Sequence, residues 1–101
     1  MKPSELLELI LERPALYLGH SSVPLLFAFL HGYECARQVE NPTLEDPVYY
    51  GFHDWIVERF GFGHSHDCAS IISFMGVSEA SAFELTKELW AEYKDLLTKT
   101  E

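Results

Sequence analysis

The sequence predicts an all-α fold, a compact bundle of four to five helices. Apolar residues recur at spacings of three and four along most of the chain, as on a helix with one buried face. Serines stand directly before several of these segments, where a hydroxyl can cap the first turn. Because 101 residues suffice for one hydrophobic core but not two, we expect a single helical domain over residues 1–101.

The first predicted helix, PSELLELILER, is short and ends at a proline. Ser4 is its candidate cap, and its apolar side holds Leu6, Leu7, Ile10 and Leu11. Pro14 ends it, since proline disfavours the helical conformation in the residue before it. The following ALYLG is predicted to be a connector, with Leu16 and Tyr17 tucked onto the bundle and Gly19 as the turning point.

The second helix is predicted to begin after Ser21 or Ser22 and to end near Val39. Pro24 lies in its first turn, where a missing N–H is harmless. A polar loop with two prolines, residues 40–47, follows.

Three further helices are predicted after this loop. They cover about Val48–Phe60, the segment CASIISFMG over residues 68–76, and about Glu79–Thr98 with Ser78 as its cap. CASIISFMG reads either as a buried helix capped by Asp67 or as a strand. We favour the helix, because a lone strand would have no partner in this chain.

The spacing also predicts a core. Ten side chains from four of these segments are expected to be buried together: Leu26, Phe29, Leu30, Tyr33, Phe52, Ile56, Phe60, Phe83, Leu89 and Trp90.

Charge and composition narrow the possible functions. Sixteen acidic and seven basic residues give a net charge of −9, which argues against binding nucleic acid or an anionic membrane surface. A basic protein surface is the macromolecular partner that fits best. No apolar run approaches the roughly 20 residues of a membrane span, and the acidic amino terminus is unlike a signal peptide. Two cysteines make no disulfide framework, so we expect a cytoplasmic protein.

Two resemblances follow from short motifs. RPALYLG resembles a stretch of the gyrase B nucleotide-binding domain, but the chain has no glycine-rich lid segments and only one asparagine, so an ATPase is rejected. The order RPALYLG, FLHGYECA, FHDWIVERFG and SEASAFELTKELWAEY resembles a group of small, acidic, uncharacterised helical proteins of bacteria. That resemblance, over about residues 5–95, implies a likeness in size and charge to immunity proteins, which neutralise bacterial toxins.

The most reactive-looking stretch is HSHDC, His64 to Cys68. Its imidazole, carboxylate and thiolate groups are all zinc ligands, but a structural site needs four converging ligands. His53 or His20 would have to fold across to complete it. A polar loop that caps the next helix is the favoured interpretation, so no metal, cofactor or catalytic residue is predicted, and a metal or enzymatic role for this loop remains the alternative.

Other candidate catalytic groups are weak. His53 is expected to be partly buried with one hydrogen bond, and not to pair with Asp54, because neighbouring residues of a helix point in different directions. Cys35 lies off the apolar face of its helix, and nothing near it in sequence would activate the thiol.

The last helix carries the clearest binding signal. Glu84, Glu88 and Glu92 follow one another at intervals of four, and Asp95 falls on the same flank. A solvated face is the commoner outcome of such a stripe, and an acidic docking ridge for a basic partner is the sharper one. Trp90 and Tyr93, if exposed, would add apolar contacts to it. The predicted function is therefore a catalytically inert binding protein, and an immunity protein that occludes a basic toxin is the form of it that the resemblance implies. Self-association through aromatic patches is a further alternative.

Overall fold

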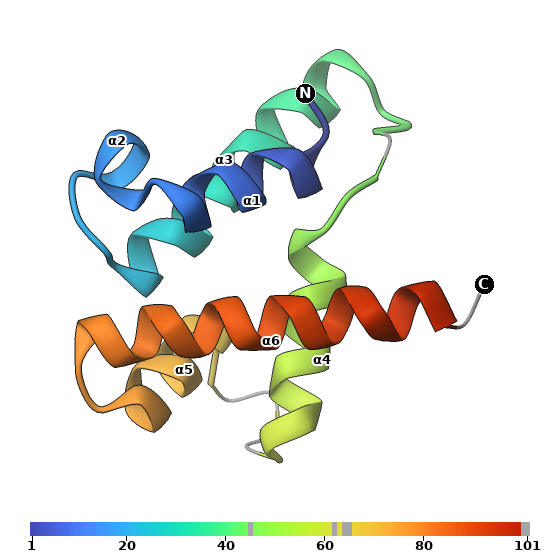
Figure 1. The fold of residues 1–101 in the computed structure, drawn as a ribbon. Helices are drawn as coiled ribbons and strands as arrows, with labels where there is room; N and C mark the ends of the chain where they lie inside the picture. The colour runs from blue at the N-terminus through green and yellow to red at the C-terminus, as the bar shows by residue number, and fades with distance from the viewer. Residues whose placement is uncertain (45, 62, 64–65, 100–101) are drawn as a thin grey trace.

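The computed structural model describes residues 1–44, 46–61, 63 and 66–99, which form six helices and no strand (Figure 1). The all-α prediction is confirmed. The helices are α1 (Pro3–Glu12), α2 (Pro14–Leu18), α3 (Val23–Glu40), α4 (Tyr49–Phe60), α5 (Cys68–Gly76) and α6 (Glu79–Lys99).

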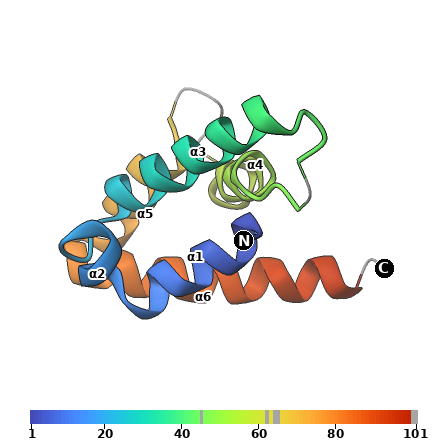
Figure 2. The ribbon, with the colours of Figure 1, turned by 90° about the horizontal axis from the view of Figure 1, so that it is seen from above.

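The helices cross one another around a shared interior. In Figure 1, α1 and α3 lie above α6, and α4 runs steeply behind α6. Figure 2, seen from above, places α3 and α6 on opposite sides of the molecule. No one helix of the described ranges combines the length and apolar character of a membrane span, although α5 and α6, joined by a bend of 119°, pass that test as a pair on length and composition.

The core is built around Phe52. This side chain is 0% exposed, and its ring lies 6.0 Å from that of Phe27, 5.3 Å from that of Trp90 and 5.3 Å from that of Tyr93. Phe52 therefore joins α3, α4 and α6. Of the predicted core, the buried residues are Leu26, Leu30, Phe52, Ile56, Phe83, Leu89 and Trp90, and the partly buried ones are Tyr33 and Phe60.

Phe29 is the exception, because it is 39% exposed and the prediction that it is buried is wrong. Successive residues of an α-helix are rotated by about 100°, so Phe27 and Phe29 point about 160° apart. The core takes Phe27, which is 3% exposed. Phe29 instead meets the edge of the Tyr17 ring at a centroid distance of 6.5 Å.

The helix starts follow the predicted caps with one exception. Ser22 accepts a hydrogen bond from the Leu25 N–H at 3.3 Å, Asp67 from Ser70 at 2.7 Å and Ser78 from Ser81 at 3.1 Å. These bonds satisfy N–H groups that a first turn leaves without partners. Ser4 was wrongly predicted as a cap. It lies inside α1, which Pro3 begins, and its hydroxyl donates to the Asp46 carboxylate.

The predicted connector after α1 is a helix of its own, which raises the count to six. Pro14 ends α1 and also opens α2, since its fixed φ suits a first helical position. Gly19, at φ +88°, ends α2 as expected of a turning glycine. Tyr17 is partly buried, but Leu16 is 69% exposed, so the expectation that Leu16 packs inward is wrong.

A buried carboxylate caps α4 from a distant part of the chain. Glu34 is 3% exposed, and its Oε2 accepts hydrogen bonds from the N–H groups of Val48 at 2.7 Å and Tyr49 at 2.9 Å. Val48 occupies the N-cap position and has no side-chain acceptor. Glu34 therefore supplies both the acceptor and a negative charge at the positive end of the helix. A buried N–H left without its acceptor would cost about 1–3 kcal/mol.

The turn between α5 and α6 is tight and strained. Ser78 N–H donates to the Gly76 carbonyl at 2.8 Å, which closes a three-residue turn around Val77 at φ +72°. A β-branched residue at positive φ is a true outlier and costs on the order of 1–3 kcal/mol. Val77 is nevertheless 91% exposed, so side-chain burial does not offset this cost.

Candidate functional site

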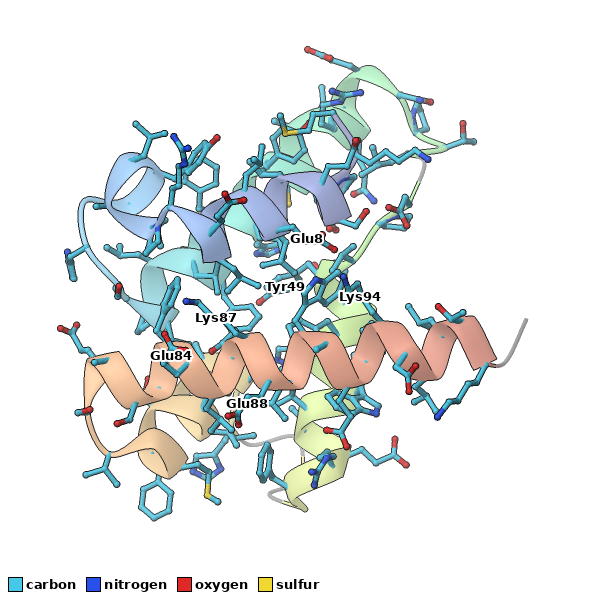
Figure 3. The ribbon with its side chains drawn as sticks, in the orientation of Figure 1. Glu8, Tyr49, Glu84, Lys87, Glu88 and Lys94 are labelled. Carbon is cyan, nitrogen blue, oxygen red and sulfur yellow. The ribbon has the colours of Figure 1, made fainter. Side chains whose placement is uncertain are left out.

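The predicted acidic residues of α6 do share one exposed flank. At about 100° per residue, Glu84, Glu88, Glu92 and Asp95 fall within an arc of about 80°. All four are exposed, and we call them the acidic flank. In Figure 3, Lys87 points toward α1, whereas Glu88 points to the opposite edge of α6.

Ion pairs within the protein neutralise much of the acidic flank. Glu84 pairs with Lys87 at 3.0 Å, Glu92 with Arg59 of α4 at 3.1 Å, and Asp95 with Lys99 at 3.0 Å. No lysine or arginine within the described ranges pairs with Glu88. Exposed pairs of this kind are worth only about 0–1 kcal/mol, so their cations exchange readily with those of another molecule.

The two aromatic residues predicted to border the flank behave differently from that prediction. Trp90 is 5% exposed, and its indole Nε1–H donates to Glu8 Oε2 at 3.2 Å. It belongs to the core and cannot serve as an exposed contact. Tyr93 is partly buried, with its ring 5.4 Å from that of Trp55, so only part of this side chain is open to solvent. The helical period puts both residues on the inner side of α6, which the sequence also allowed.

A second charged contact holds α1 to α6. Lys94 Nζ donates to Glu8 Oε2 at 2.8 Å, and Figure 3 shows these two side chains extending toward each other. The hydrogen bond from Lys94 lowers the pKa of Glu8, against the raising effect of burial. Asp46, in the loop before α4, lies beside α6 on this side, where it lines a hollow of about 240 Å³ with Lys94. Glu45 lies outside the described residues.

Histidine and tyrosine side chains cluster where α3 meets α4. The His31 ring stacks on Tyr49 at 4.3 Å with an interplanar angle of 10°, and its Nε2 lies 3.1 Å from the Tyr50 hydroxyl. His53 Nδ1 lies 3.1 Å from Asp54 Oδ1, so the expectation that these neighbours do not pair is wrong. Their Cβ atoms point in different directions, but Nδ1 is the ring nitrogen nearest the backbone, so the carboxylate of the neighbouring residue is within its reach.

The HSHDC stretch is only partly described, since His64 and Ser65 lie outside the described residues. Asp67 acts as the cap of α5, and Ser70 hydrogen bonds lower its pKa. Burial raises the pKa of the Cys68 thiol to about 12, so this sulfur is protonated near neutral pH and is a poor nucleophile. The described residues contain no group of three or more His, Cys, Asp or Glu side chains placed to hold a metal ion.

An exposed apolar surface at the start of the α5–α6 turn was not predicted. Phe74 is 72% exposed, Met75 44% and Val77 91%. The sequence FMGV did not predict an exposed surface, because an apolar run near a helix end is usually buried. Phe74 and Met75 lie on the outer side of the last turn of α5, and Val77 lies at the centre of the turn that follows.

Comparisons of this chain with protein-family models, with curated proteins and with solved structures find no match.

Proposed function

We propose that this chain is a catalytically inert binding protein whose acidic flank covers a basic surface of another protein. The observation that carries the proposal is the exposure of all four carboxylates along α6 in a chain of net charge −9. Long-range attraction from such a charge speeds encounter with a cationic surface. A helix held on a packed core also loses little conformational entropy on docking.

Glu88 is the centre of the proposed contact. The other three acids of the flank each have a lysine or arginine of this chain nearby, whereas Glu88 has none among the described residues. A lysine or arginine of the partner would therefore meet Glu88 without displacing an internal cation. Glu84, Glu92 and Asp95 would contribute by exchanging their cations for those of the partner.

A bacterial toxin that cleaves nucleic acid is the partner that fits this chemistry best. Such an enzyme needs a cationic groove to bind phosphates, and an acidic protein can block that groove without a reaction of its own. The resemblance to immunity-like proteins favours the same partner. This function would place the protein in the cytoplasm, where the toxin would act.

The test is a charge reversal with a matched control. Glu88→Lys should slow association with the basic partner protein by about two- to tenfold and weaken the salt dependence of association, because an attraction becomes a repulsion. Glu40→Lys changes the net charge equally at an exposed site at the end of α3, away from α6, and should have a much smaller effect. Surface plasmon resonance at two salt concentrations measures both. Equal effects of the two variants would show that overall charge, not the flank, governs binding.

Self-association is a second candidate, favoured by the exposed apolar residues Phe74, Met75 and Val77. A large apolar side chain that is 72% exposed, such as Phe74, gains from burial against a second copy. Sedimentation velocity of the purified chain would then show a dimer at micromolar concentration, and Phe74→Ser would return it to a monomer. A parent protein that sediments as a monomer removes this candidate.

A further inference from the structure

A groove runs between α3 and α5. Its wider part is a hollow of about 460 Å³, which reaches from Tyr49 and Asp67 to Ser73, and a smaller hollow of about 140 Å³ continues from Ser73 to Glu79. Both hollows are lined by Pro24 and Ser73, so they adjoin at these two residues.

The walls of this groove combine three kinds of chemistry. Apolar groups of α3, among them Pro24 and Phe27, line it from one side. From the other side, Ser70, Ser73 and Ser78 contribute hydroxyl groups along α5 and its following turn. Hydroxyl groups can donate to and accept from the backbone of an extended peptide, whose polar groups need partners once they leave water.

A carboxylate stands at each end of the groove. Asp67 lies at one end and Glu79 at the other, and no lysine or arginine is among the described residues that line either hollow. The basic side chains near the two carboxylates are histidines: Glu79 lies 3.7 Å from His20 Nε2, and His53 and His66 contribute to lowering the pKa of Asp67. An anion is disfavoured because Asp67 already occupies the amino end of α5. The ends of the groove therefore attract positive charge.

We propose that the groove binds a short, extended, basic peptide segment with two cationic residues four positions apart. Asp67 directly precedes α5 and Glu79 follows it after two turn residues, so the nine residues of α5, about 14 Å at a rise of about 1.5 Å each, set the scale of the separation between the two carboxylates. Four steps of an extended chain, at about 3.3–3.6 Å per residue, cover the same length. An arginine at each end then meets one carboxylate, and an apolar residue between them lies against Pro24 and Phe27. The groove reaches α6 only at Glu79 and Ala82, in its first turn, and none of the four acidic-flank residues is among those that line it, so this second site goes beyond the proposed function.

The probe is the blocked peptide Arg-Ala-Leu-Ala-Arg, titrated into the full-length protein and followed by isothermal calorimetry at low salt. Asp67→Asn and Glu79→Gln should each weaken binding by about two- to fivefold, the range expected for one exposed ion pair. Asparagine also caps helices well, so Asp67→Asn should leave the fold intact. Ser73→Trp fills the junction of the two hollows from an exposed position and should weaken binding more than tenfold.

Two controls separate this site from the acidic flank. The peptide Glu-Ala-Leu-Ala-Glu should not bind, and Glu88→Lys should leave binding of the arginine peptide unchanged. Circular dichroism melting confirms that each variant is folded. The proposal is overturned if the arginine peptide shows no binding at millimolar concentration, if folded Ser73→Trp binds it as the parent does, or if Glu88→Lys is the variant that abolishes binding. That last result would instead support the acidic flank as the general site for cations.

Discussion

Phe52→Ala is expected to destabilise the protein by about 3–5 kcal/mol, the usual cost of truncating a buried phenylalanine. The ring is fully buried and touches aromatic side chains of α3 and α6, so its loss leaves a cavity where three helices meet. Small domains are stable by about 5–15 kcal/mol, so this one change removes a large share of the total. Urea unfolding followed by circular dichroism measures it.

Phe29→Ala is the matched control, because it makes the same chemical change in α3 at a side chain that is already 39% exposed. Its ring has Tyr17 as its described aromatic neighbour. We expect a loss of about 0.5–1.5 kcal/mol, in line with partial burial. If both variants lost the same stability, the assignment of the inner face of α3 to Phe27 would be wrong.

Gly76→Ala is expected to cost about 2–4 kcal/mol, near or above the usual range for overpacking. A Cβ at Gly76 would lie 2.4 Å from Ala82 Cα and 2.6 Å from Ala82 N, which are backbone atoms of α6 and cannot turn away. The end of α5 and the first turn of α6 would have to separate. Thermal unfolding should show a melting temperature lower by roughly 8–30 °C, at about 4–8 °C per kcal/mol for a domain of this size.

Gly32→Ala should have the opposite sign. Gly32 lies in the middle of α3, and a Cβ there meets nothing within 4 Å. Alanine restricts the unfolded chain and favours the helix by about 0.5–1 kcal/mol. A destabilised Gly32→Ala variant would mean that α3 approaches a neighbour more closely than this structure shows.

The sequence predicted the helices well because their signals are local. The apolar period of α3 and α6 and the capping groups Ser22, Asp67 and Ser78 act within one or two turns, so they can be read without knowing the fold. The predicted number of helices was low by one, because Pro14 both ends α1 and begins α2. A proline interpreted only as the end of a helix does not predict the helix that follows it.

The misses at the candidate site are contacts between distant segments. Glu34 caps α4 across 14 positions, Glu8 pairs with Lys94 across the bundle, and Arg59 reaches Glu92 from another helix. No regular sequence spacing predicts these pairs, because the loops between the helices determine which residues meet. The exposure of the four acidic residues follows from the local period of α6 and could be predicted. The ion pairs that partly neutralise them and the bond from Trp90 to Glu8 depend on other helices and could not.

The two cysteines give the protein a built-in reporter of its own motions. Cys35 is exposed, whereas Cys68 is 1% exposed in the first turn of α5. A thiol reagent should therefore modify Cys35 at once and reach Cys68 only when α5 lifts away from α3 and α4. The rate of that second reaction, compared with the rate in unfolded chain, gives the free energy of local opening. Thiol modification thus measures how often α5, which forms one wall of the groove, detaches, and it requires no engineered label.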